Sequence, residues 1–245
     1  MSADLIVYGV IAAGLVFWLR SILGTRHGEE RERPSSLAGT GEIASDLPEE
    51  KQAMQEHALS GSERIQDLAQ NPKGAFSIEN KTAENGLIAI ARAEKDFDID
   101  FFGEACQDVF VMVVEAFARG EREALEDLLR EDVYKAFEAA ISEREASGET
   151  LESEIHAIKK AQVISAMVEG KTSYITVRFV AEETRVCRDK EGEIISGNPD
   201  RVSEMIDIWT FAHDVSGRDP RWLLIETRSE DPEQDNDLVP DTKID

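Results

Sequence analysis

Cysteine is almost missing from this chain, since only Cys106 and Cys187 occur in 245 residues. Their spacing fits neither a zinc site nor a C-x-x-C redox pair, and so few thiols are typical of a reducing compartment. A secreted fold held by several disulfides is therefore excluded. We expect each cysteine to be a small core or strand residue.

Positive charge is also scarce. The chain has 27 Lys and Arg residues against 51 Asp and Glu, a formal net charge of −24. Nucleic-acid binding needs clustered Lys and Arg, and cytoplasmic leaflets are negative, so we expect neither a nucleic-acid partner nor broad adhesion to anionic lipid. The acid excess is explained either by solubility or by an acidic docking face for a basic partner segment.

The usual signatures of catalysis are absent as well. The sequence has no G-x-S-x-G, H-E-x-x-H, P-loop or G-x-G-x-x-G pattern. Because these motifs are absent, we expect no cofactor, no metal site and no enzyme activity.

Aromatic residues are absent between Trp18 and Phe76. This stretch is rich in Glu, Ser, Gly and Gln, a composition that buries too little apolar surface to offset the entropy of ordering. We predict a flexible acidic linker over residues 25–76, with a transient helix over 48–69. A flexible tether of about 50 residues has a root-mean-square reach of roughly 35–45 Å.

Charge of either sign is absent from residues 5–19, which predicts a membrane anchor over residues 1–24. Extended to Leu23, a helix of this run is about 28 Å long, close to the hydrocarbon thickness of about 30 Å. A cleaved signal peptide and a buried core helix are the alternatives. Basic residues follow the run, so we expect the C-terminal side to be cytoplasmic. The anchoring side chains are Leu5, Ile6, Val7, Ile11, Leu15, Val16, Phe17, Trp18 and Leu19.

Residues 77–231 have the patterns of a folded α+β domain. Apolar residues recur at helical spacing over 83–95, over 98–120 with Asp98 as N-cap, over 125–129, and over 132–148 with Asp132 as N-cap. The helix after Asp98 carries an apolar series that includes Phe101, Phe102, Val109 and Met112. We expect these helices to pack on one face of a sheet.

Beyond Gly148 the period changes to that of strands. Residues 172–183 alternate, with Ile175, Val177, Phe179 and Ala181 on one face, and further strands are predicted over 151–168, 202–215 and 222–227. A series of consecutive strands with no helix between them favours an antiparallel sheet. The acidic tail, residues 232–245, is predicted to be disordered.

Several spaced residues then resemble a known family. The pattern Asp96-Phe97-Asp98-x-x-Phe101 opens a helix, and Asp207-Ile-Trp209-Thr-Phe211 and Asp219-Pro-x-Trp222-x-Leu224 close the domain. With Gly120-Glu121, Leu125-x-x-Leu128-Leu129 and Tyr134-x-x-Phe137 between them, they resemble the C-terminal domain of the motor-tethering subunit (subunit forty-four) of the mitochondrial inner-membrane translocase.

This resemblance implies a cone-like fold similar to nuclear transport factor two, with a curved antiparallel sheet around an apolar pocket. It implies a tether or adaptor for protein partners, such as chaperones or translocation machinery, with lipid contact at an inner membrane. The N-terminal anchor is of the kind found in bacterial relatives. Where the family has Arg this chain has His213, and the region before residue 77 is short and acidic, so chaperone recruitment is not carried over.

We therefore expect a single-pass protein of the bacterial inner membrane whose cytoplasmic domain binds a protein partner or a lipid acyl chain, in protein translocation or membrane-protein assembly. The alternative is a small-molecule enzyme or lipid carrier on the same fold that uses Asp207 and His213, since a carboxyl group beside Trp209 could act as a general acid or base. The candidate pocket residues are Phe110, Val114, Phe179, Trp209, Phe211 and Trp222.

Overall fold

The computed structural model describes residues 61–217, 219–230 and 239–242, all within the second of the chain's two units, Leu47–Asp245. The predicted anchor and the linker before residue 61 lie outside the described residues. The helices are α3 (Lys81–Ala93), α4 (Ile99–Arg119), α5 (Arg122–Leu128) and α6 (Glu131–Ser147). The strands are β1 (Phe76–Ile78), β2 (Thr150–Glu169), β3 (Thr172–Arg188), β4 (Ile194–Gly197), β5 (Ser203–Asp214) and β6 (Leu223–Ser229).

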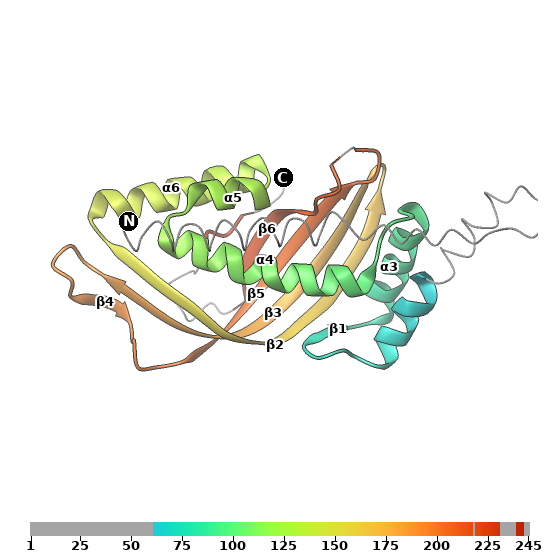
Figure 1. Cartoon of the computed structure of the whole chain (residues 1–245), viewed down its shortest axis with the longest axis horizontal. Helices are drawn as coiled ribbons and strands as arrows, with labels where there is room; N and C mark the ends of the chain where they lie inside the picture. The colour runs from blue at the N-terminus through green and yellow to red at the C-terminus, as the bar shows by residue number, and fades with distance from the viewer. Residues whose placement is uncertain (1–60, 218, 231–238, 243–245) are drawn as a thin grey trace, which may run out of the picture. The chain divides into compact units, whose positions relative to one another are not determined.

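Helices pack on a curved sheet, which confirms the α+β class (Figure 1). The strand order is β1-β2-β3-β5-β6, and β4 pairs with β3 off this path. Strands β2, β3, β5 and β6 are antiparallel, as predicted, whereas β1 runs parallel to β2 and makes the sheet mixed. Register shifts along β2, including one between Ile155 and Ala157, are bulges of the kind that bend long strands.

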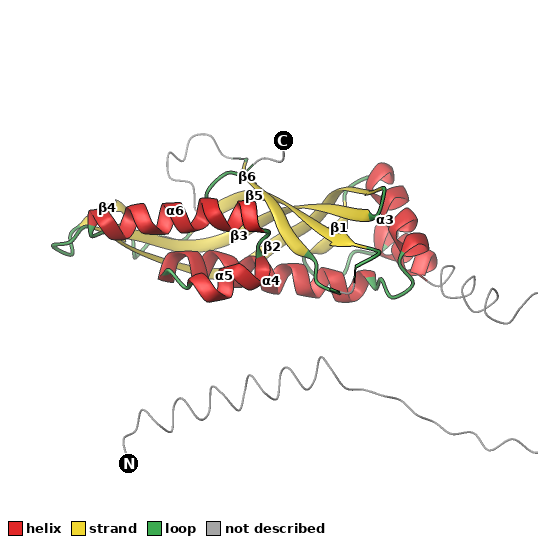
Figure 2. Ribbon diagram, turned by 90° about the horizontal axis from the view of Figure 1, so that it is seen from above, coloured by secondary structure: helices red, strands yellow, loops and turns green. Residues whose placement is uncertain are grey.

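The core lies between the sheet and the helices, with α4 crossing over the strands (Figures 1 and 2). Ile175, Val177, Phe179 and Ala181 of β3 are all fully buried, which confirms the predicted core face of that strand. Helix α4 begins as expected, because Asp98 Oδ1 accepts hydrogen bonds from the backbone N–H groups of Asp100 and Phe101 at 2.9 and 3.3 Å.

Two local expectations for the helices were wrong. Helix α6 has Arg130, not Asp132, as its N-cap, and Arg130 Nε instead donates to Asp132 Oδ1 at 2.7 Å. On α4, Phe101 and Met112 are exposed although they share the periodic series of the buried residues, because that series is wider than the face covered by the sheet.

The predicted start of the domain at residue 77 is too late. Residues 61–70 are helical, and Ile65 and Leu68 are buried to 0% and 1% exposure within the core. Phe76 of β1 is also buried. Few apolar residues suffice to order this segment, because Ile65 and Leu68 join an apolar core that the rest of the domain already provides.

The predicted disorder of residues 232–245 is wrong for residues 239–242. Val239 is buried, and Thr242 forms a bridge to Thr227 of β6. The hydroxyl of Thr227 donates to the carbonyl of Pro240 at 2.6 Å. This short segment covers the outer edge of β6, an arrangement that protects an edge strand.

Candidate functional site

The predicted pocket residues lie together, but they fill the core. The rings of Phe110 and Phe179 stack with centroids 4.4 Å apart, and Trp209 lies 4.8 Å from Phe110. Val114 and Phe211 are each 1% exposed. Only Trp222 of the six is half-buried. The sequence therefore identified one cluster, whose close ring contacts are those of a packed interior.

A cavity in the described residues lies elsewhere. It has a volume of about 200 Å³ and lies between the helix of residues 61–70 and the loop joining α3 to α4. Arg64 Nη1 and Asp98 Oδ2 form an ion pair across it at 3.0 Å. None of the six predicted residues lines it. The lining residues are Gly61, Arg64, Ile65, Asp96, Phe97, Asp98 and Ile99.

Phe97 connects this cavity with a second group of residues. Its ring lies 5.8 Å from Trp222 and 6.2 Å from Phe102. Trp222 in turn stacks on the imidazole of His213, with ring centroids 5.4 Å apart and planes at 29°. The rings of Phe97 and Trp222 therefore connect the cavity with His213.

His213, near the end of β5, joins three parts of the fold. Its Nδ1 is 2.8 Å from Glu94 Oε2, at the end of α3, and its Nε2 is 3.2 Å from the carbonyl oxygen of Asp219. The His213 ring thereby links the end of α3 with the loop after β5. Glu94 Oε1 is buried without a hydrogen-bond partner, which leaves a buried carboxylate only partly satisfied.

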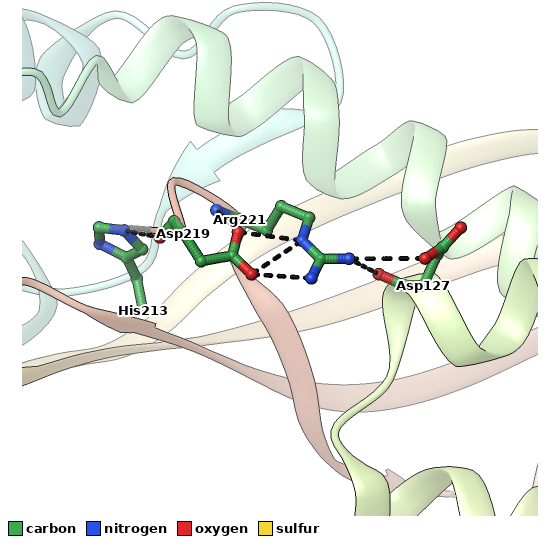
Figure 3. Close-up of polar contacts among 4 residues, drawn as sticks. All are labelled: Asp127, His213, Asp219 and Arg221. Atoms are coloured by element: carbon green, nitrogen blue, oxygen red, sulfur yellow. Dashed lines mark hydrogen bonds and ion pairs between the residues drawn. The ribbon is translucent and has the colours of Figure 1, made fainter. Parts of the chain in front are cut away.

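Asp219 extends this network to α5 (Figure 3). Arg221 Nη2 donates to Asp219 Oδ2 at 2.7 Å and Arg221 Nη1 to the carbonyl oxygen of Asp127 at 3.1 Å. The Arg221 side chain, together with its backbone N–H, lowers the pKa of the Asp219 carboxyl group to about 2. This network fixes the loop between β5 and β6 against α5.

Asp207 and His213 do not meet. Both lie on β5 six positions apart, which places them about 20 Å from one another along the strand. Asp207 is 3% exposed and accepts a hydrogen bond from Trp209 Nε1 at 3.2 Å. The two residues therefore cannot share a substrate atom in this arrangement.

A sequence profile of the Tim44-like domain matches residues 83–229, more than half of the chain. The chain belongs to the Tim44-like domain family. Among curated relatives, the mouse and human mitochondrial import inner membrane translocase subunits TIM44 are 27% and 28% identical over 60% of this chain. A Caenorhabditis elegans relative, probable subunit tin-44, is 23% identical over 64% of the chain. The alignment spans 33% of the length of the mouse and human proteins.

Among solved structures, the intermembrane space region of the chloroplast protein ARC6 matches 54% of this chain and 96% of its own, with 17% identity and a TM-score of 0.41. The Tim44-like match extends from α3 through β6. The helix of residues 61–70, β1 and residues 239–242 pack on the matched region from outside it. The described cavity therefore has one wall within the Tim44-like region and one wall before it.

Chemistry elsewhere in the Tim44-like domain is limited. No group of three or more His, Cys, Asp or Glu side chains in the described ranges is placed to hold a metal ion. Burial raises the pKa of the Cys106 thiol, so it stays protonated and unreactive. No helix within these ranges is long and apolar enough to span a membrane.

Sequence reasoning missed Glu94, Arg64 and the cavity. Glu94 fell on the apolar face of its helix, and a carboxyl group at such a position signals a buried partner, here His213. Arg64 was missed because its segment was predicted to be part of the flexible linker.

Proposed function

We propose that this Tim44-like protein is a membrane-anchored adaptor whose folded domain binds a protein partner at the inner membrane, in protein translocation or membrane-protein assembly. The main support is the Tim44-like match from α3 through β6, since the curated relatives named above are inner membrane translocase subunits. The predicted anchor and linker add a way of holding the domain near a bilayer, which raises its effective concentration for partners there.

The packed interior favours a protein partner over a lipid acyl chain. Small-molecule sites usually measure about 300–1,000 Å³. The described cavity is about 200 Å³, and the side chains of Phe110, Phe179 and Trp209 are fully buried in contact with one another. We infer that binding uses the outer surface of the domain.

In-cell crosslinking followed by affinity purification tests the adaptor function. We expect reproducible recovery of inner-membrane or translocation proteins with the full chain, and loss of that recovery when residues 1–24 are removed. Recovery of no such partner would contradict the proposal. Carbonate extraction tests the anchor separately, since an anchored chain stays in the membrane pellet.

An enzyme or lipid carrier is the second candidate because of one observation, the pairing of half-buried His213 with buried Glu94 beside Trp222. Asp207 lies too far along β5 to assist it. If this site were catalytic, His213→Gln and Glu94→Gln would abolish an activity while crosslinked partners persisted. The adaptor proposal predicts that Asp207→Asn leaves the phenotype intact.

A further inference from the structure

An exposed apolar strip runs along the outer face of α4. Phe101 and Met112 are 63% and 38% exposed, and Ala105 and Val109 lie half-buried between them. Their positions fall at i, i+4, i+8 and i+11, which share one side of a helix. The strip is about 16 Å long. Figure 1 shows α4 lying over the sheet, and the exposure of Phe101 and Met112 places the strip on the solvent side of this helix.

An acidic row runs beside this α4 strip. Glu104 and Asp108 are exposed on the same helix, and no Lys or Arg side chain in the described ranges pairs with either carboxylate. About two turns further on, Glu115 is paired with Arg119 at 3.1 Å. The outer face of α4 therefore presents apolar side chains next to uncompensated negative charge.

We propose that the α4 strip is the docking surface for a positively charged amphipathic helix of a partner protein. Such a helix would lay an apolar stripe with i, i+3, i+4 spacing along Phe101 to Met112 and direct Lys or Arg toward Glu104 and Asp108. The small side chain of Ala105 permits close approach of the two helices.

Charge decides against the other occupants. A second copy of this chain would bring acidic row against acidic row, which is electrostatically unfavourable. An anionic membrane surface would be repelled by the same carboxylates. A cationic helix is the partner that satisfies both the apolar and the acidic half of the surface.

The inference rests on the proposed adaptor function and adds the surface and the partner chemistry. It is tested with the full chain in phosphatidylcholine nanodiscs and an 18-residue amphipathic peptide with Leu on one face and Lys on the other. Controls are the peptide with Glu in place of Lys, a scrambled peptide that lacks helical periodicity, and empty nanodiscs. The double variant Phe101→Ser/Met112→Ser removes the strip, Glu104→Gln/Asp108→Asn removes the charge, and Ile195→Ser is a matched exposed control.

We expect the Lys peptide to bind at least tenfold more tightly than either control peptide, and each double variant to lose at least tenfold while Ile195→Ser binds as the parent chain does. Equal binding by the double variants would overturn the inference. Sedimentation that shows a dimer broken by Phe101→Ser/Met112→Ser would overturn it too, in favour of a second copy. If the peptide fails while crosslinked partners are still recovered, this surface is wrong and the adaptor function stands.

Discussion

Phe110 and Phe101 lie on the same helix in opposite environments. Phe110 is fully buried and stacks on Phe179 at 4.4 Å, whereas Phe101 is 63% exposed. We expect Phe110→Ala to lower the free energy of unfolding by about 3–5 kcal/mol, because it removes a ring from a packed cluster. Phe101→Ala is the matched control and should cost less than about 0.5 kcal/mol. Urea unfolding of both variants at neutral pH measures the difference, and equal losses would contradict the assignment of the core face.

The Asp219 carboxyl group provides a pH prediction at the same scale. Its pKa is lowered from 3.8 to about 2 by Arg221, so its stabilising contribution is complete above about pH 4 and disappears as the pH falls toward 2. The ion pair is half-exposed, so screening should limit this contribution to about 0.5 kcal/mol. Asp219→Asn should therefore be less stable than the parent chain at pH 7, and the difference should shrink as the pH falls through about 2.

The control for that pH series is Asp127→Asn, whose carboxylate lies 3.6 Å from Arg221. It should show a smaller change at pH 7. A stability difference for Asp219→Asn that persisted unchanged to pH 2 would mean that the carboxylate charge is not its origin.

At the scale of elements, helix α3 and strand β2 approach each other closely at Gly86. A Cβ atom there would lie 1.8 Å from the carbonyl oxygen of Ala166, a backbone atom that cannot turn aside. We expect Gly86→Ala to destabilise the domain by about 1–3 kcal/mol through overpacking. Gly61→Ala is the matched control, since its Cβ would make an ordinary contact at 3.5 Å with Ala91. Thermal unfolding should separate the two variants, and equal melting temperatures would argue against the close packing of α3 on β2.

Sequence patterns predicted the long elements better than their ends and partners. The alternation in β3 and the Asp98 cap are local features, and both were confirmed. The parallel pairing of β1 was not predictable, because a strand of three residues carries almost no periodicity. Arg130 replaced Asp132 as the cap of α6 because its backbone N–H donates to the carbonyl of Leu224, which fixes where the helix begins.

At the scale of the whole molecule, the folded unit includes residues before the predicted boundary. Ile65 is fully buried in the core, so Ile65→Ala in the full chain should cost about 2–5 kcal/mol. Gln66→Ala, at the exposed neighbouring position, is the matched control and should be nearly neutral. Guanidinium unfolding measures both. If Ile65→Ala were as mild as the control, the helix of residues 61–70 would not belong to the cooperative unit.

The C-terminal segment offers a parallel test. Ending the chain after residue 238 removes buried Val239 and the Thr242 bridge to Thr227. We expect this truncation to lower the melting temperature, because it exposes apolar surface and the edge of β6. Ending the chain after residue 242 should leave the melting temperature unchanged. Hydrogen exchange at the Thr227 amide, which donates to Thr242 Oγ1 at 2.9 Å, should rise only in the shorter chain.

The sequence by itself determined the class of the fold, the approximate positions of its long helices and strands, the Tim44-like family and the residues of its aromatic cluster, because periodicity and spaced motifs are properties of the local chain. Only the tertiary structure decided that this cluster fills the core, that His213 meets Glu94 and not Asp207, and that residues 61–70 and 239–242 belong to the folded unit. Each of these depends on which distant surfaces are brought into contact, and burial on such a surface can order a segment whose own composition does not favour structure.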